Sequence, residues 1–233
     1  MKRIKLLKRS TRRKLIKLSH RDGFMICIGV GLALVVLVIG KNMKAQPTPL
    51  AASGGITISW LPASVKQWQQ PITTMSQKYN IDPNLLAIIM TMESGGSPKA
   101  DSGQAQGLMQ ITPPTAGDIA SKYLQKPVAS YDIWDPQTNI EFGAAYLAHL
   151  RDVFGTSSQA PSWNTTVELI AAGYNGGPGA ASSLEKGEGL HDMQTVSYSR
   201  DAYNMWRERH AADSPTFDRW KERGGIDLLQ KAQ

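Results

Sequence analysis

An uninterrupted apolar run is the first clear pattern along the chain. Residues 24–40, FMICIGVGLALVVLVIG, carry no charged side chain over 17 positions. Apolar side chains on all sides exclude a surface helix with one wet face. A helix of this length would be about 25 Å long, near the lower limit for crossing a bilayer. The run therefore predicts a transmembrane helix.

Two other kinds of segment share this pattern, a buried core helix and a cleaved signal peptide. Nothing that precedes the run could cover a core helix. A signal peptide would have an unusually long charged region here, and KNMKAQPTP after the run contains no small-x-small cleavage site. Cys27 lies early in the run, unlike a lipid-attachment cysteine. We expect a retained anchor, with a cleaved signal peptide as the alternative.

A second pattern, with helical period, follows Asp82-Pro83. Asp82 is a good N-cap, and Pro83 stands in the first turn, where its missing N–H costs nothing. Apolar residues then recur at the spacing of one helix face, at Leu85, Ile88, Ile89 and Met92. Gly95-Gly96 ends the helix. The pattern predicts a helix over 83–94 with one apolar face.

Glu93 lies in the last turn of this helix, on a stripe with Leu86 and Met90. The negative end of the helix dipole and the apolar neighbours both disfavour the ionised carboxylate. Both effects raise the pKa of Glu93, as a general acid near neutral pH requires. From this helix alone, an ordinary exposed glutamate at a helix end remains the alternative.

The rest of the chain divides by composition. Residues 41–59 contain two prolines, two adjacent glycines and several small residues, and we expect a flexible linker. A globular domain is expected over 60–210. Residues 211–233 are polar with scattered apolar positions, which predicts a C-terminal tail, either loose or binding a partner.

Charge changes this picture through its location. The 233 residues include 26 Lys and Arg against 19 Asp and Glu, and the net charge of +7 suggests nucleic-acid binding. Residues 1–23 hold ten of the basic residues and one acid, so they carry +9, and the other 210 residues carry −2. We therefore expect a basic cytoplasmic tail that fixes membrane orientation, an outward domain, and no nucleic-acid partner.

Composition excludes two classes of protein. The single cysteine cannot form a disulfide within the chain, which excludes a disulfide-stapled fold. A hydrophobic fraction of 41% with 19% charged residues argues against a wholly disordered chain.

Three motifs appear in order along the outward part. They are Glu93-Ser94, then Gly107-Leu108-Met109-Gln110, then a Gly-rich segment that contains Tyr174-Asn175 and ends in Gly177-Pro178-Gly179. With Asp135-Pro136 and the Asn139 to Leu147 segment, they resemble the soluble lytic transglycosylase (SLT) family. These goose-type-lysozyme-like enzymes cut bacterial peptidoglycan. The resemblance covers roughly residues 65–205.

The resemblance implies a mainly α, α+β lysozyme-like fold, with a single catalytic domain behind the transmembrane helix. It implies that Glu93 is the catalytic acid and base, supported by Ser94 and by a hydrogen bond from Tyr174. It implies substrate contacts from Gly107, Leu108, Met109, Gln110, Tyr174 and Asn175, with Met109 and Gln110 lining the cleft.

Three positions depart from the family pattern. Gly173 and Gly176 stand where alanine is usual. Gln194, in a segment that runs to Tyr198, stands where the family has glutamate. If that glutamate supports the active site, Gln194 can still form hydrogen bonds but carries no charge.

The reaction implied is non-hydrolytic. Glu93 protonates the oxygen between N-acetylmuramic acid and N-acetylglucosamine, and the C6 hydroxyl of the muramic sugar closes a 1,6-anhydro ring. A hydrolytic muramidase, with Asp101 as a possible second carboxylate, and a non-catalytic peptidoglycan-binding scaffold are the alternatives. A solvated loop position is the simpler interpretation of Asp101, and a surface or capping charge that of Glu141.

No cofactor is expected, and the histidines show no metal-binding spacing, so no metal site is predicted. The expected partners are peptidoglycan glycan strands and the inner membrane, through residues 24–40. The resemblance also suggests a secretion or conjugation complex of the envelope. The expected location is the bacterial inner membrane, with a single span, the N-terminus in the cytoplasm and the catalytic domain in the periplasm.

Overall fold

The computed structural model describes residues 54–127, 130–155 and 163–233. Within these ranges, β structure is limited to two isolated antiparallel bridges, Asp101 with Gln106 and Gln106 with Ile111. All other regular elements of the described chain are helical, which confirms the mainly α class.

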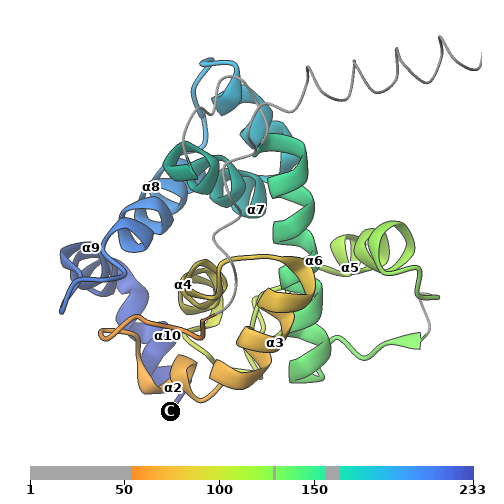
Figure 1. The fold of residues 1–233 in the computed structure, drawn as a ribbon, viewed down its shortest axis with the longest axis horizontal. Helices are drawn as coiled ribbons and strands as arrows, with labels where there is room; N and C mark the ends of the chain where they lie inside the picture. The colour runs from red at the N-terminus through yellow and green to blue at the C-terminus, as the bar shows by residue number, and fades with distance from the viewer. Residues whose placement is uncertain (1–53, 128–129, 156–162) are drawn as a thin grey trace, which may run out of the picture. The chain divides into compact units, whose positions relative to one another are not determined.

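The helical elements are shown in chain order in Figure 1, and the segments after α4 and after η1 are the longer connections between described elements before α6. The elements are α2 (Ala63–Lys66), α3 (Gln69–Tyr79), α4 (Pro83–Ser94), α5 (Pro113–Asp118), the π-helical turn η1 (Ile119–Tyr123), α6 (Pro136–Phe154), α7 (Trp163–Glu185), α8 (Met193–Arg207), α9 (Pro215–Trp220), a second π-helical turn η3 (Lys221–Gly225) and α10 (Ile226–Lys231).

Helix α4 begins and ends where the sequence predicts. The Asp82 carboxylate accepts a hydrogen bond from Asn84 N at 2.8 Å, which caps the first turn. Gly95 follows the helix with φ at 62°, a left-handed conformation that glycine adopts without strain. Both signals act within a few residues of the helix ends. The predicted start and the predicted end of α4 are confirmed.

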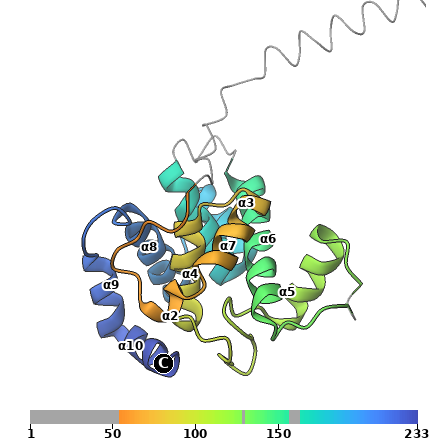
Figure 2. The same cartoon turned by 60° about the horizontal axis from the view of Figure 1, so that its bottom comes forward.

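The burial of α4 differs from the prediction of one apolar face. Every residue from Pro83 to Met92 is buried, and so is Ser94. The helix lies between α6 and α8 in both views (Figures 1 and 2), and it also contacts α2 and α3. Its N-cap is tied to α8, because Trp206 Nε1 donates to Asp82 Oδ2 at 3.0 Å. A helix that is covered on all sides can be apolar all round.

Helix α6 carries a buried carboxylate that was predicted to lie at the surface. Glu141 is only 8% exposed. Its oxygens accept from Lys78 Nζ at 2.5 Å, Tyr79 Oη at 2.9 Å and Lys126 Nζ at 2.7 Å. The surface prediction was wrong because these partners come from α3 and from the segment after η1. Glu141 joins three parts of the fold.

The C-terminal residues pack on the domain. Phe217 of α9 and Leu229 of α10 are buried, and the Phe217 ring lies 5.3 Å from that of Trp60. A side chain at Gly95 would come within 2.8 Å of the Leu228 backbone, so α10 lies against the end of α4. The loose-tail alternative for 211–233 is therefore wrong.

The domain also begins earlier than residue 60. Ile58 is 3% exposed and belongs to the core. Thr57 N donates to Asn84 Oδ1 at 2.8 Å, and Ser59 Oγ donates to Ala211 O at 3.0 Å. The end of the predicted linker is thus part of the fold, because it fills a place between α4 and the C-terminal segment.

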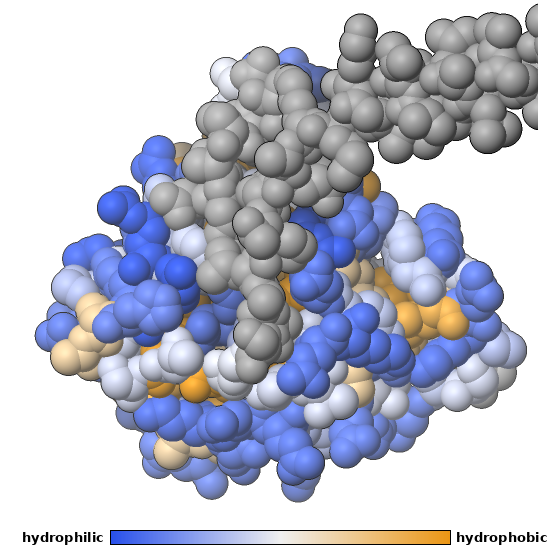
Figure 3. Space-filling model, viewed as in Figure 1, coloured by the Kyte–Doolittle hydropathy of each residue, from blue (hydrophilic) through white to orange (hydrophobic). Residues whose placement is uncertain are grey.

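The basic tail (1–23), the apolar run (24–40) and most of the linker (41–59) lie outside the described residues. Among the helices that the structure does describe, none is long and apolar enough to cross a membrane. On the face shown in Figure 3, hydrophilic residues predominate, and apolar colour is visible on the side where α5 and η1 lie.

Candidate active site

The carboxyl group of Glu93 lies at the junction of α4 and α8. Tyr198, in the second turn of α8, donates a hydrogen bond from Oη to Glu93 Oε1 at 2.5 Å. The two residues are 105 positions apart in the sequence. This bond fixes one oxygen of the carboxyl group at the end of the buried helix.

Burial sets the protonation of Glu93. Part of the residue reaches the surface, but protein atoms surround its carboxyl group, and this desolvation raises its pKa to about 7. The hydrogen bond from Tyr198 stabilises the carboxylate and lowers the pKa, but burial has the larger effect. The raised pKa predicted from the sequence is confirmed, with burial as the cause.

Ser94 ties the end of α4 to the Gly107–Gln110 loop. Its hydroxyl donates to Leu108 O at 2.7 Å and accepts from Gly96 N at 3.1 Å. Ser94 is 1% exposed, so this link is internal. The contact supports the predicted positioning role beside Glu93.

The Gly107–Gln110 loop packs against α6 and is also held by contacts of its own side chains. Gly107 has φ at 75°, and an added Cβ would come within 2.4 Å of Asn139 Nδ2. Asn139 Oδ1 accepts from Met109 N at 2.7 Å, and its amide nitrogen donates to Gln106 O at 2.9 Å. Asn139 therefore fixes the loop against α6, which leaves no room for a side chain at position 107.

The side chains of Leu108 and Met109 are fully buried. The expectation that Met109 lines the cleft is wrong for its side chain, because that side chain packs beside Gly143 of α6. Gln110 has φ at 46°, and its amide nitrogen donates to Ala100 O and Gly107 O, both at 3.0 Å. The Gln110 amide thus stabilises the loop, and its glycan contact stays a prediction.

Tyr174 of α7 has a different partner from the one expected. Its hydroxyl donates to Met109 O at 2.8 Å, and the hydrogen bond to Glu93 comes from Tyr198 instead. Tyr174 still lies near enough to Glu93 for the charge of that carboxylate to help raise its pKa, after the larger effect of burial. Tyr174 thus supports the loop, and direct support of Glu93 belongs to Tyr198.

Asn175 lies in α7, two residues before Gly177, where the helix is interrupted. Its Oδ1 lies 3.0 Å from Thr195 Oγ1 of α8. An added Cβ at Gly176 would come within 2.8 Å of Thr195, so glycine allows α7 and α8 to approach closely here. Gly173 likewise packs against Leu150, at 2.8 Å from an added Cβ. Both departures from the family pattern therefore have a packing reason.

Two other polar residues singled out from the sequence lie outside this constellation. Gln194 is exposed in the first turn of α8, where its backbone N–H donates to Asp192 Oδ1 at 3.3 Å. Asp101 is exposed, and its Oδ1 accepts from Gly103 N at 2.7 Å, as in a loop turn. Within the described residues, no group of three or more His, Cys, Asp or Glu is placed to hold a metal ion.

The role of Tyr198 was not predicted from the sequence. The residue ends the segment that begins at Gln194, which resembles the family pattern. Gln194 is the obvious departure from the family pattern in that segment. The hydroxyl that contacts Glu93 belongs to Tyr198, four residues later. A tyrosine at the end of a family-like segment was the available signal.

Comparison with known proteins agrees with this geometry. A family model described as "Transglycosylase SLT domain" matches residues 70–195. Membrane-bound lytic murein transglycosylase E of Buchnera aphidicola is 30% identical over 142 residues, which make up 59% of this chain and 64% of that protein. Membrane-bound lytic murein transglycosylase C of Cronobacter sakazakii is 31% identical over 184 residues, or 74% and 50% of the two chains.

The chain thus spans less than two thirds of the length of these curated relatives. Among solved structures, an inactive mutant of lytic transglycosylase Slt from Pseudomonas aeruginosa is similar, with a TM-score of 0.50 and 18% identity. The match covers 82% of this chain and 30% of that one. It supports the lysozyme-like fold.

Proposed function

Because the chain belongs to the transglycosylase SLT domain family, we propose that it is a peptidoglycan lytic transglycosylase with Glu93 as its acid and base. The observation that carries the proposal is the buried carboxyl of Glu93, whose pKa of about 7 is set by burial against a hydrogen bond from Tyr198. Near neutral pH both protonation states are populated. A group that first donates and then accepts a proton needs both states.

In the first step, protonated Glu93 donates its proton to the oxygen that joins N-acetylmuramic acid to N-acetylglucosamine. The bond from C1 of the muramic sugar to that oxygen breaks, and N-acetylglucosamine leaves with a free hydroxyl. The 2-acetamido group of the muramic sugar stabilises the positive charge that develops at C1. This assistance replaces the second carboxylate of most glycosidases.

In the second step, the C6 hydroxyl of the same muramic sugar attacks C1. The Glu93 carboxylate accepts the hydroxyl proton, which restores the starting acid, and a C6–O–C1 bond closes the 1,6-anhydro ring. No water is consumed. Tyr198 holds one oxygen of Glu93 throughout, because its own pKa lies well above the ordinary value and it stays a donor.

The remaining site residues have two kinds of role in this proposal, support of the loop beside Glu93 and contact with the substrate. Ser94 and Tyr174 hold the loop beside Glu93 through the carbonyls of Leu108 and Met109. Substrate contacts are proposed for Asn175, for the amide oxygen of Gln110, and for the backbone of 107–109.

We further propose that residues 24–40 anchor the chain in the inner membrane, with the basic tail in the cytoplasm and the domain in the periplasm. The names of the relatives above include the words "membrane-bound", which supports membrane association. The charge partition of the sequence supports the orientation. An enzyme in this place would open the wall locally, for which a secretion or conjugation complex is the proposed partner.

The reaction is tested with the full-length chain on purified peptidoglycan, with product masses as the readout. We expect 1,6-anhydromuropeptides from the natural chain and from Glu222→Gln, a matched change at an exposed glutamate. We expect a loss of about 1,000-fold or more with Glu93→Gln, since the amide can act neither as an acid nor as a base near neutral pH. Equal activity of Glu93→Gln and the natural chain would refute the proposal.

The product masses also distinguish the proposed reaction from the two alternatives, a muramidase and a scaffold. Reducing-end products, heavier by one water, would indicate a muramidase. Binding of glycan strands without turnover would indicate a scaffold. The structure weakens both, because Asp101 is used in an exposed turn and the altered glycines have a packing role.

A further inference from the structure

The last part of the chain, residues 215–231, contacts both helices that carry the Glu93–Tyr198 pair. It consists of α9, η3 and α10, and it lies after the region that matches the family. In both views α10 lies beside α2, on the side of the domain where the chain ends (Figures 1 and 2). We call residues 215–231 the C-terminal brace.

On α4, the C-terminal brace contacts the turn that follows Glu93. Gly95 stands two residues after Glu93. A Cβ added to Gly95 would come within 2.8 Å of the Leu228 carbonyl group and 3.0 Å of Leu229 N. From the other side, Ser64 Oγ of α2 donates a hydrogen bond to Gly95 O at 2.6 Å. The turn is therefore enclosed between α2 and α10.

On α8, the C-terminal brace contacts the helix about one turn after Tyr198. Arg223 Nη2 of η3 donates to Asp201 Oδ2 at 2.5 Å, and Asp201 is three residues after Tyr198. The Asp201 side chain is only 15% exposed. Between the two contact points, a Cβ added to Gly225 would come within 2.4 Å of the Trp220 ring, so η3 packs directly on α9. The contact with α8 and the contact with α4 are therefore joined by a packed turn.

The last turn of a helix needs outside contacts to keep one conformation. Its final carbonyl groups have no partner within the helix, and helix ends fray. Gly95 and Gly96 follow the last turn of α4, both with positive φ, and glycine has the greatest backbone freedom of any residue. Tyr198 can donate to Glu93 only while this turn and α8 keep their separation. The C-terminal brace contacts both.

We propose that the C-terminal brace positions the catalytic acid, because it holds the end of α4 and α8 at the separation that the Tyr198–Glu93 hydrogen bond needs. Arg223 and Leu229 are positioning residues in this proposal, since they act on the carboxyl group through α8 and α4. The proposal rests on the function proposed above and adds to it a segment outside the family match.

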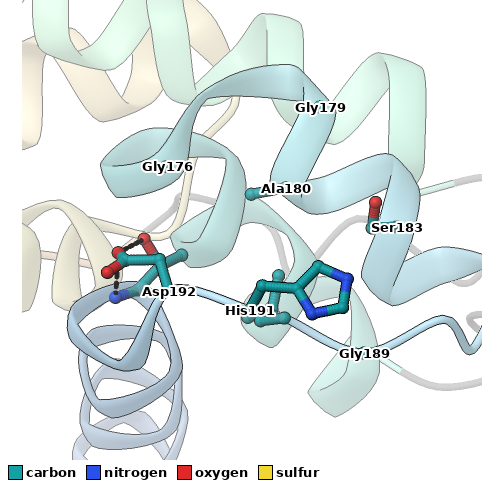
Figure 4. Close-up of a pocket in the computed structure, with 9 residues that line it drawn as sticks. Gly176, Gly179, Ala180, Ser183, Gly189, His191 and Asp192 are labelled. Atoms are coloured by element: carbon teal, nitrogen blue, oxygen red, sulfur yellow. Dashed lines mark hydrogen bonds between the residues drawn. The ribbon is translucent and has the colours of Figure 1, made fainter.

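The C-terminal brace takes no part in the pocket at the start of α8 (Figure 4). Gly176, His191 and Asp192 line that pocket. Thr195 also lines it and lies 3.0 Å from Asn175, for which a substrate contact is proposed above. No residue of the C-terminal brace is among the lining residues. A loosened brace should therefore lower kcat and leave KM unchanged.

The test is a double-mutant cycle on kcat, measured with the full-length chain by release of anhydro product from soluble glycan strands. Arg223→Gln removes the ion pair at a side chain that is 51% exposed, so the core stays intact. Leu229→Ala removes a side chain that is 8% exposed, beside the end of α4. Each change is also made together with Tyr198→Phe, which removes the hydrogen bond that the C-terminal brace is proposed to align.

We expect kcat to fall about fivefold in Arg223→Gln and about tenfold in Leu229→Ala, with KM unchanged. In the Tyr198→Phe background, each change should lower kcat by less than about twofold, because the aligned hydrogen bond is already absent. Arg223→Lys keeps the positive charge and should restore most of the activity.

Two control changes separate positioning from folding. Phe154→Ala removes a 5% exposed side chain at the C-terminal end of α6, and Arg200→Gln changes an exposed arginine of α8. Phe154→Ala should lower the urea midpoint at least as much as Leu229→Ala, with kcat unchanged where the chain is folded. Arg200→Gln should behave as the natural chain.

Three results would overturn the positioning role. They are an unchanged kcat in both Arg223→Gln and Leu229→Ala, equal losses from Leu229→Ala in the natural and Tyr198→Phe backgrounds, and a loss of kcat in Phe154→Ala that equals the loss in Leu229→Ala. Absence of anhydro product from the natural chain would instead overturn the proposed reaction. The natural chain and Glu93→Gln are therefore measured in the same series.

Discussion

At the scale of single residues, Glu93 is poised by two opposed effects. Burial disfavours its carboxylate, and the Tyr198 hydroxyl favours it, which together bring the pKa to about 7. Without burial the carboxyl would be ionised at neutral pH and could not donate a proton. The hydrogen bond therefore orients the carboxyl group but does not lower its pKa so far that it is always ionised at neutral pH.

Tyr198→Phe tests this balance. Removing the hydroxyl removes a hydrogen bond to the carboxylate, so kcat/KM should fall roughly 10- to 100-fold. The pKa of Glu93 should rise further, because the lost bond stabilised the ionised form. The acid form then persists to higher pH, and the alkaline limb of the pH–rate profile should move upward from about 7.

Tyr203→Phe, at a half-buried tyrosine of the same helix, is the control and should leave the profile in place. A Tyr198→Phe profile that superimposes on the natural one after scaling would show that the hydroxyl does not set the acidity of Glu93.

The residue scale also shows how far the sequence could predict the site. The raised pKa of Glu93 was predicted from its neighbours within the helix, whereas its catalytic role was implied by the resemblance of the ordered motifs to the family. Tyr198 was not assigned, because its contact depends on α8 packing against α4 across 105 positions. Met109 looked like a cleft residue in the motif, but the path of its side chain is decided by Gly143 on α6.

At the scale of elements, local signals predicted where helices end but not what covers them. Asp82 and Gly95 fix the ends of α4 through hydrogen bonds and backbone conformation within a few residues. All-round burial of α4 arises from α2, α3, α6 and α8, and no local pattern contains that information. The same reason explains the wrong surface prediction for Glu141.

Glu141→Gln should destabilise the junction of α3, α6 and the segment after η1. Burial alone would raise the pKa of Glu141, but hydrogen bonds from Lys126, Lys78 and Tyr79 outweigh it and lower the pKa to about 2. We expect a loss of about 1–3 kcal/mol at pH 7, near the lower end because the lysine side chains are 54% and 38% exposed. Urea unfolding measures this difference.

The sign of the pH dependence is set by the lowered pKa. The folded state holds the carboxylate more strongly than the unfolded state, so its contribution is fully present above about pH 4.5 and is lost as the pH falls through about 2. The difference between Glu141→Gln and the natural chain should shrink over this window. Glu188→Gln, at an exposed position, should show neither effect, and a constant difference down to pH 2 would contradict the ion-pair account.

Phe217→Ala tests whether the C-terminal helices are part of the fold. The side chain is 6% exposed and lies against Trp60 and Trp220. Its removal should cost about 3 kcal/mol of unfolding free energy. Ile226→Ala in α10 is the control, since Ile226 is 41% exposed and should cost less than about 1 kcal/mol. Equal stability of both variants would restore the loose-tail interpretation.

At the scale of the whole molecule, the folded domain extends further along the chain than the region that matches the family. The match ends at residue 195, whereas Tyr198, the Trp206 bond to Asp82 and the α10 contact with Gly95 lie beyond it. Residues after the matched region therefore contribute to the site through Tyr198 and hold both ends of α4 through Trp206 and α10. The motifs inside the match were predictable from the sequence, but the role of the C-terminal elements was not, because packing rather than a motif gives them that role.

The charge partition leads to a prediction about the complete chain. Ten basic residues before the apolar run and Lys41 and Lys44 after it favour a cytoplasmic N-terminus. Glu93 would then lie on the side of the membrane that holds peptidoglycan, which links the orientation to the proposed activity. Replacing the ten basic residues by Gln and adding a cluster of Lys after residue 44 should invert the protein in the membrane.

A C-terminal alkaline phosphatase fusion, active only outside the cytoplasm, measures this orientation. The inverted-charge chain should lose the phosphatase signal, and release of anhydro products by living cells should stop, because Glu93 no longer reaches the wall. Neutralising Lys41 and Lys44 alone is the control and should preserve both signals. If the inverted-charge chain kept its outside reporter, the basic tail would not be the orientation signal, and if the natural chain were recovered without residues 1–40, the segment would be a cleaved leader.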